Sequence, residues 1–177
     1  YRNFITKISN ANNFLRLNKC SYDKNLEIKK INLKINQWIY AEFKKTTDLV
    51  KKHLEDFRFD EARTVIYNFV WGSYCDWYLE FLKPIFSSEN KEAKEEATTF
   101  SSYMFMNMLK LLHPFIPFYS EYMWQENKFD RFFKSALIVS NWPEPIKNLN
   151  FNKSSKEIES LIEIITAIRS TKVQLNI

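Results

Sequence analysis

Two carboxylates one helical turn apart, Asp76 and Glu80, are the pair of residues in this chain that best fits acid–base chemistry. Glycoside hydrolases place two such carboxylates across a cleft. Two acids at i and i+4 on one inward helix face are more typical of structural pairing within a helix bundle, either in an ion pair or as helix-cap acceptors. We therefore expect Asp76 and Glu80 to be structural, and a bundle enzyme that uses them is the minor alternative.

The two histidines, His53 and His113, lack the neighbours that a catalytic or metal site needs. A di-iron bundle places a glutamate three residues before each histidine. Here those positions hold Val50 and Lys110. No Ser/His/Asp or Cys/His arrangement stands out either, so we predict no catalytic residue and no metal ligand.

A polar stripe near the start of the chain has the chemistry of RNA binding. Residues 2–16 have the periodicity of one amphipathic helix, whose apolar face consists of Phe4, Ile8, Ala11 and Leu15. The stripe beside that face consists of Asn3, Lys7, Asn10 and Phe14. Cationic, amide and aromatic side chains on one stripe suit phosphates and unstacked bases. A solvated helix flank with Phe14 at the border of the core explains the same spacing, so both interpretations stay open on spacing alone.

The composition predicts an all-α fold. The chain has 177 residues, of which 45% are hydrophobic and 17% aromatic, which is enough for a substantial core. Its single glycine, Gly72, excludes a Rossmann fingerprint and a P-loop, because a loop that cradles phosphate needs several glycines. So few glycines also argue against a β-sandwich or barrel, which needs many tight turns.

The charge and cysteine content are compatible with an RNA-binding protein of the cytoplasm. A net charge of +5 permits a nucleic-acid partner without demanding one. Cys20 and Cys75 lie far apart and have no zinc-site spacing, so we expect reduced, cytoplasmic thiols. No apolar run approaches the roughly 18 residues of a membrane span, and no signal peptide is visible. The chain starts at Tyr1 rather than Met, and we expect it to be part of a longer polypeptide.

Helical periodicity predicts four main helices joined by short links, which favours an antiparallel helix bundle. The predicted ranges are 2–16, 33–54, 58–84 and 95–112, with a short further helix at 118–125. Pro84 is expected to end the third helix. Asp76 and Glu80 are expected to continue the inward face of that helix, and Gly72 within it suggests a close approach to a neighbouring helix.

The chain is predicted to divide into three parts. Residues 1–135 form the helical bundle, residues 136–155 an extended linker, and residues 156–177 the start of a C-terminal subdomain. The linker contains Trp142-Pro143-Glu144-Pro145, which is rigid and extended. The last part combines a helix at 156–171 with a truncated strand. The inward face of that helix should consist of Ile158, Leu161, Ile162, Ile165 and Ile168. The strand is predicted from the alternation of Val173, Leu175 and Ile177.

Several runs of residues, in order along nearly the whole chain, form a recognisable set. They are Arg2-Asn3-Phe4 with Lys7 and Asn10-Ala11; Phe57-Arg58-Phe59-Asp60-Glu61-Ala62; Tyr67-Asn68-Phe69-Val70-Trp71; Tyr74-Cys75-Asp76-Trp77-Tyr78-Leu79-Glu80 with Lys83; Leu111-Leu112-His113-Pro114-Phe115-Ile116-Pro117-Phe118 with Glu121 and Trp124-Gln125; and Trp142-Pro143 with Ala167-Ile168-Arg169. Together they resemble the anticodon-binding helical bundle of the valyl-tRNA synthetases, a family of class I aminoacyl-tRNA synthetases. The isoleucyl and leucyl families share the fold and are the alternative.

The resemblance implies a module that recognises the anticodon stem-loop of tRNA(Val) for an enzyme, valine–tRNA ligase, that attaches valine to tRNA with ATP and Mg. In that family the catalytic domain, with its His-x-Gly-His and Lys-Met-Ser-Lys-Ser motifs, and the editing domain precede the bundle. This chain contains neither motif. The resemblance therefore implies a chain that is inactive alone, binds no cofactor, and works beside the catalytic and editing domains of the same polypeptide, in a monomeric, cytoplasmic ligase.

The resemblance also implies roles for residues of the first helix. The position of Lys7 contacts a base or its phosphate, and that of Phe14 stacks under an anticodon base, which is worth roughly 1–3 kcal/mol. Bacterial members often have Arg immediately before this Phe, whereas this chain has Asn13, which lacks the permanent charge. Arg2, Asn3 and Asn10 are lesser candidates. The alternative function is a helical protein-interaction module, whose aromatic side chains fill a groove of a partner.

Overall fold

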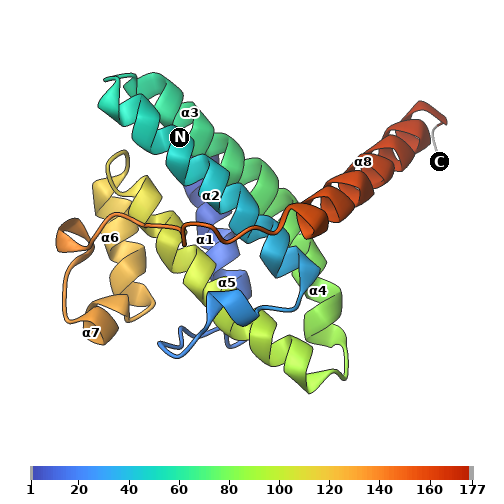
Figure 1. The fold of residues 1–177 in the computed structure, drawn as a ribbon, viewed down its shortest axis with the longest axis horizontal. Helices are drawn as coiled ribbons and strands as arrows, with labels where there is room; N and C mark the ends of the chain where they lie inside the picture. The colour runs from blue at the N-terminus through green and yellow to red at the C-terminus, as the bar shows by residue number, and fades with distance from the viewer. Residues whose placement is uncertain (1, 176–177) are drawn as a thin grey trace.

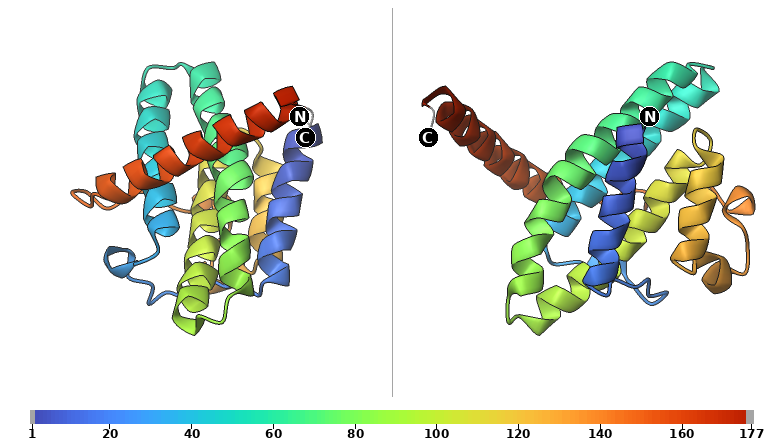
Figure 2. Two further views of the ribbon diagram at one scale, coloured as in Figure 1. Left: turned by 90° about the vertical axis from the view of Figure 1, so that its right-hand side faces the viewer. Right: turned by 180° about the vertical axis from the view of Figure 1, so that it is seen from behind.

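The protein is an antiparallel helix bundle, as predicted. The structure, a computed structural model, describes residues 2–175, and these contain no β-strand. The long helices of the bundle are α1 (Arg2–Leu17), α2 (Lys34–Glu55), a composite helix over residues 59–87, and α5 (Lys91–Leu112). They run alternately up and down, side by side (Figures 1 and 2). The all-α prediction is confirmed.

Helix α5 is the centre of the bundle. From Phe100 to Leu112 nearly all its side chains are buried, whichever way they point, as expected for a helix surrounded by others. Its neighbours each bury one face against the common core, for example Ile8 and Leu15 of α1 and Phe43 of α2. Asn90 caps its N-terminus by accepting a hydrogen bond from the Ala93 amide at 3.0 Å.

The composite helix changes its winding in the middle. It consists of α3 (Phe59–Asn68), the π-helical segment η2 (Phe69–Tyr78) and α4 (Leu79–Ser87). A π-helix forms i→i+5 rather than i→i+4 hydrogen bonds and so changes which residues share a face. Tyr74 and Tyr78 are fully buried here. Asp76 is only half-buried and Glu80 is exposed, so the prediction that these two residues continue the inward face is wrong.

Two other expectations for this helix are also wrong. Pro84 does not end it, because α4 continues to Ser87; a proline this close to the C-terminus removes a hydrogen bond from the last turns only. Gly72 does not mark a close approach, since a Cβ placed there would meet no atom within 4 Å.

Short elements complete the bundle. After the turn that follows α5, Pro117 occupies the first position of α6 (Pro117–Glu126), where its missing N–H costs nothing. Helix α7 (Phe129–Phe133), which the pattern did not predict, follows directly. Two 3₁₀ turns, η1 (Ile28–Lys30) and η3 (Leu137–Val139), lie in connecting segments, so the predicted linker 136–155 is not extended throughout.

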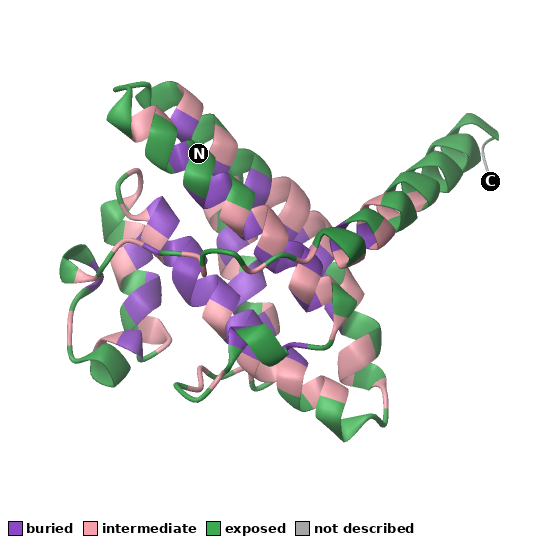
Figure 3. Cartoon of the chain, viewed as in Figure 1, coloured by how far each residue is buried: buried purple, intermediate pink, exposed green. Residues whose placement is uncertain are grey.

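Helix α8 (Asn152–Leu175) corrects the prediction for the C-terminal part. It begins four residues before the predicted helix and remains helical through Val173 and Leu175, so the predicted strand is wrong for these two; Ile177 lies outside the described residues. Its first turns pack on α2, and the rest projects away from the bundle (Figures 1 and 3). Of the predicted inward face only Ile158 is buried, while Leu161 and Ile168 are exposed. No helix of the described chain is long and apolar enough to cross a membrane.

Candidate RNA-binding surface

Helix α1 has one buried face, two flanks that touch neighbouring helices, and one outer face. Ile8, Ala11 and Leu15 are buried, as the predicted apolar face requires. One flank meets η2 and α4, the other meets α6, and Figure 2 shows α1 lying across the back of the bundle. The six residues predicted to bind RNA are therefore distributed between one flank and the outer face.

The flank toward η2 holds Lys7. Its ammonium group forms an ion pair with Asp76 and lies 4.2 Å from the ring centroid of Trp71. The side chain of Lys7 is 26% exposed and that of Asp76 44% exposed, so a ligand in solvent can reach both groups. Lys7 is thus accessible, as RNA binding requires, but its charge is already compensated.

Phe14 occupies the same flank, two turns further along α1. Its ring is half-buried and lies 5.9 Å, centroid to centroid, from that of Phe86 in α4. The ring is fixed from one side by this contact. Near the start of the helix, the ring of Phe4 stacks on that of Tyr67 at 5.0 Å, and Tyr67 in turn stacks on Trp71 at 5.6 Å. Aromatic rings therefore line this flank from end to end.

The flank toward α6 is committed to hydrogen bonds within the fold. The Ser9 hydroxyl lies 2.6 Å from the Tyr119 hydroxyl, and the Asn12 amide donates to a carboxylate oxygen of Glu126 at 2.9 Å. The other oxygen of Glu126 pairs with Arg16. This flank positions α1 in the bundle, and the sequence pattern did not predict these contacts.

The outer face carries the remaining candidates. Arg2, Asn3, Asn10 and Asn13 are all exposed. Within the described chain, the side chains of the three asparagines make no hydrogen bond, whereas the buried amides of Asn12, Asn36 and Asn107 are all hydrogen-bonded. Arg2 takes part in none of the ion pairs formed among residues 2–175. Free amides and a free guanidinium give this face several donors and acceptors for a ligand.

Asp76 and Glu80 each form an ion pair with a lysine, which is one of the structural roles expected for the two acids. Asp76 points to Lys7, 69 residues away along the chain, and Glu80 accepts a hydrogen bond from Lys83 at 2.6 Å on the exposed side of α4. Asp76 faces a lysine of α1, whereas Glu80 faces a lysine of its own helix. Neither acid is buried, so they lack the closed cleft that a bundle enzyme would need.

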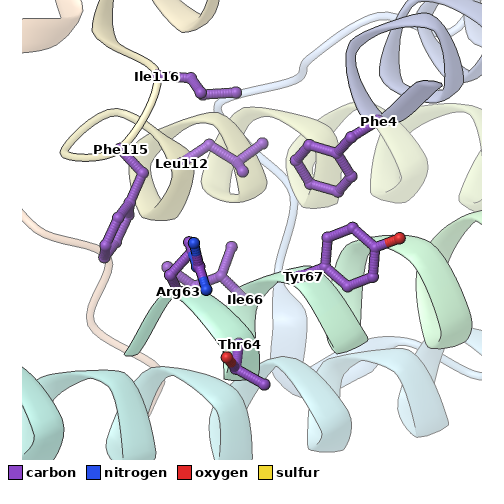
Figure 4. A pocket seen from close by; sticks show the side chains of 8 residues that line it. All are labelled: Phe4, Arg63, Thr64, Ile66, Tyr67, Leu112, Phe115 and Ile116. Atoms are coloured by element: carbon purple, nitrogen blue, oxygen red, sulfur yellow. The ribbon is translucent and has the colours of Figure 1, made fainter. Parts of the chain in front are cut away.

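A hollow of about 360 Å³ lies beside the N-terminal end of α1. It is lined mainly by apolar side chains, from Phe4 of α1, Ile66 and Tyr67 of α3, Leu112 of α5 and the corner that follows (Figure 4). Arg63 is the one charged residue of its lining. Its lining contains no carboxylate, histidine or cysteine.

Burial disfavours the thiolate form of both cysteines, which is the nucleophilic form. Burial raises the pKa of the Cys75 thiol to about 12, and burial also raises the pKa of Cys20. Neither thiol forms a disulfide. Among the residues that the structure describes, no three His, Cys, Asp or Glu side chains lie close enough together to hold a metal ion.

Comparison with known proteins identifies the family. Residues 36–177 match the family model of the anticodon-binding domain of tRNA ligase. The whole chain aligns with the valine–tRNA ligase of Pelagibacter ubique at 45% identity over 177 residues, covering 20% of that protein. It also aligns over its full length with the valine–tRNA ligases of Agrobacterium fabrum at 39% and Zymomonas mobilis at 38% identity.

The chain belongs to the anticodon-binding domain family of tRNA ligases. The resemblance inferred from the sequence motifs is thereby confirmed. The family model begins within α2, so it does not include α1; the alignments to the valine–tRNA ligases do. This anticodon-binding domain spans about one fifth of the length of the relatives it matches.

Two residues of the candidate surface escaped the sequence analysis. Trp71, which contacts Lys7, is noted in the sequence only within the segment Tyr67–Trp71, and Asp76 is expected to be structural without a named partner. No signal in the sequence pairs either of them with Lys7, because the contact joins distant segments and depends on the π-helical winding of η2.

Proposed function

We propose that this anticodon-binding domain binds the anticodon stem-loop of a valine tRNA through α1. The observation that carries the proposal is the row of amide side chains at Asn3, Asn10 and Asn13. They are exposed, spaced along one helix face and free of hydrogen bonds to the rest of the described chain. Amides read base edges through paired donors and acceptors, and the unpaired bases of an anticodon loop present such edges.

The flank beside this row supplies the remaining contacts. Phe14 stacks on an anticodon base, with Phe86 supporting its ring from one side. Base–aromatic stacking of this kind is worth about 1–3 kcal/mol. Arg2 contacts the phosphate backbone, because it is the exposed cation of the outer face without an ion-pair partner in residues 2–175. Asn13 takes part through hydrogen bonds rather than charge.

We further propose that the domain contributes recognition, and not chemistry, to a valine–tRNA ligase. The names of its relatives support this role, and so does the match of residues 36–177 to the anticodon-binding domain family. In the complete enzyme, ATP with Mg and the catalytic and editing domains belong to other parts of the polypeptide. We propose a monomeric enzyme of the cytoplasm, which the free thiols of Cys20 and Cys75 support.

A titration of the 177-residue chain with a fluorescent valine anticodon stem-loop tests the proposal. Replacing Asn10 and Asn13 by alanine should weaken binding about five- to 150-fold, since each of the two lost hydrogen bonds costs about 0.5–1.5 kcal/mol. Asn141→Ala is the matched control, because this exposed amide lies in the segment between η3 and α8, which crosses the opposite side of the bundle from α1 (Figures 1 and 2). Equal affinities of the control and the double variant would contradict the proposed surface.

Exposed aromatic residues favour a protein-contact surface as a second candidate function. Phe118 is 92% exposed and Tyr122 58% exposed, and they lie one turn apart on α6. A protein partner covers such side chains with apolar surface. If the chain binds no stem-loop at low salt, the second candidate is the better one, and Phe118→Ser should then abolish capture of a protein partner.

A further inference from the structure

The ammonium group of Lys7 is held from two sides. Asp76 pairs with it directly, and the ring centroid of Trp71 lies at 4.2 Å. A cation over an indole face is stabilised by the ring quadrupole, and a carboxylate neutralises it. The site formed by Lys7 and Asp76 therefore has no net charge, although the chain as a whole carries +5.

The π-helical winding of η2 builds this arrangement. Trp71 and Asp76 are five residues apart, and both lie in η2. In an α-helix they would point about 140° apart. In a π-helix, whose hydrogen bonds join residues i and i+5, they follow each other on one side of the helix. Both can then face Lys7 across the interface with α1.

A neutral pair is a poor site for phosphate. A phosphate oxygen that approached Lys7 would also approach the carboxylate of Asp76, and like charges repel. The edge of an unpaired base is neutral and presents N–H donors beside acceptors. Lys7 has three N–H donors, of which one is used by Asp76, and the carboxylate retains acceptor capacity in its second oxygen. The Lys7–Asp76 pair therefore offers both a donor and an acceptor to the edge of a base.

We propose that Lys7 and Asp76 together read the edge of an amino-bearing base, and that Asp76 determines specificity. Asp76 accepts a hydrogen bond from the amino group, and Lys7 donates to the neighbouring acceptor. Cytosine and adenine both have this arrangement, and we take cytosine as the base that is read. Uracil places a carbonyl oxygen where cytosine has the amino group, and that oxygen would face the carboxylate. Asp76 also keeps Lys7 from contacting phosphates of any RNA. This inference rests on the proposed function, since it assigns chemistry to one part of the same surface.

The experiment compares two stem-loops at several salt concentrations. One carries the valine anticodon, and in the other the anticodon cytosine that pairs with the first base of the codon is replaced by uracil. The wild-type chain should prefer the first by about ten-fold, the usual scale for one well-read base. Asp76→Asn should narrow the preference to below about three-fold, and should bind the uracil stem-loop more tightly than the wild type does. Its binding should also depend more steeply on salt, by about 0.7 in the slope for one extra phosphate contact of a single strand.

Two further variants distinguish a role of Asp76 in base specificity from a general effect of removing one negative charge or of disturbing the fold. Glu80→Gln removes the same charge one turn along the helix, where Glu80 pairs with Lys83 at comparable exposure, and it should change neither the preference nor the slope. The double variant Lys7→Met/Asp76→Asn leaves a neutral site without either group. It should lose the preference but keep the wild-type slope, and it serves as the test if the single variant does not fold.

The outcomes distinguish this inference from the proposed function. If the wild-type chain binds neither stem-loop, the proposed function fails. If it binds the valine stem-loop but Asp76→Asn keeps the preference and the salt slope, or changes them no more than Glu80→Gln does, Asp76 is only a structural link between α1 and η2 and the inference is wrong.

Discussion

Helices α1 and α8 have the same kind of sequence but opposite surroundings. Both carry isoleucines at helical spacing, and both form the expected helix. In α1 the apolar face is buried from Ile8 through Ala11 to Leu15, whereas in α8 only Ser155 and Ile158 are buried and Ile164 is 57% exposed. The contrast shows that an apolar stripe predicts a helix and a face, but not whether anything covers that face.

The difference comes from the neighbours of each helix. Helix α1 contacts η2, α5 and, through side chains, α6. Helix α8 is tied to α2 at its start, where Ser154 lies 2.5 Å from the Gln37 amide oxygen and Glu157 pairs with Lys34 at 2.5 Å. Further out, Ile162 is partly buried against the core, and Arg169 lies over the ring of Trp77 at 5.1 Å. We therefore expect the first turns of α8 to contribute most of the free energy that holds this helix against the bundle.

The largest expected effect is on stability, when an isoleucine is removed from each helix. Ile8→Ala should lower the free energy of unfolding by about 2–5 kcal/mol, because the side chain is fully buried and leaves a cavity. Ile164→Ala, its counterpart in α8, should change it by less than about 0.5 kcal/mol. Urea unfolding measures both. A cost at Ile164 similar to that at Ile8 would mean that α8 is covered in solution.

A smaller loss of stability is expected for one of two adjacent asparagines of α1 and not for the other. Asn12 is buried and donates to Glu126, so Asn12→Ala should destabilise the fold by about 1–3 kcal/mol by leaving buried polar groups unpaired. Asn13 is exposed and unbonded, so Asn13→Ala should leave stability unchanged and affect RNA binding alone. Thermal unfolding and the stem-loop titration together assign each residue. A stability loss at Asn13 would place it in the fold rather than in the RNA-binding surface.

The smallest of the three effects is a loss of stability at alkaline pH, and it is confined to the bundle. Burial raises the pKa of Tyr74 and of Tyr78 well above its ordinary value. Because the folded-state pKa is raised, the stabilisation is complete below the ordinary value of about 10 and is lost as pH rises through the folded value. We expect about 1–2 kcal/mol less stability at about pH 10.5 than at pH 8 for these two groups together.

The same pH range provides the control for that comparison. Helix α8 contains no tyrosine, so alkaline pH should leave the packing of its first turns on α2 unaffected until the bundle itself unfolds. Urea unfolding at the two pH values, followed by tyrosine absorbance, measures the change. Equal stability at both values would show that the phenols are not buried in solution.

Much of the fold could be predicted because it depends on local pattern. The helical class follows from the near absence of glycine, the boundaries of α1 and α2 follow from periodicity, and the end of α5 follows from the prolines after Leu112, although α5 begins at Lys91, four residues before the predicted start. The exposed candidates Asn3, Asn10 and Asn13 were predicted correctly as lying off the apolar face. What failed depends on other elements: the strand at Val173 and Leu175, the linker boundary, and the inward position of Asp76.

The sequence by itself determined the helices, the buried face of α1 and the polar and aromatic residues beside that face, because these depend on spacing within one segment. Only the tertiary structure decided what those residues do for one another. It pairs Lys7 with Asp76, which is 69 residues away in the sequence. Asp76 faces α1 because η2 is π-helical, and the local sequence pattern did not predict this winding. The physical reason is that the interaction of a charged side chain depends on which groups are nearest to it in space, and these neighbours are set only when the helices pack.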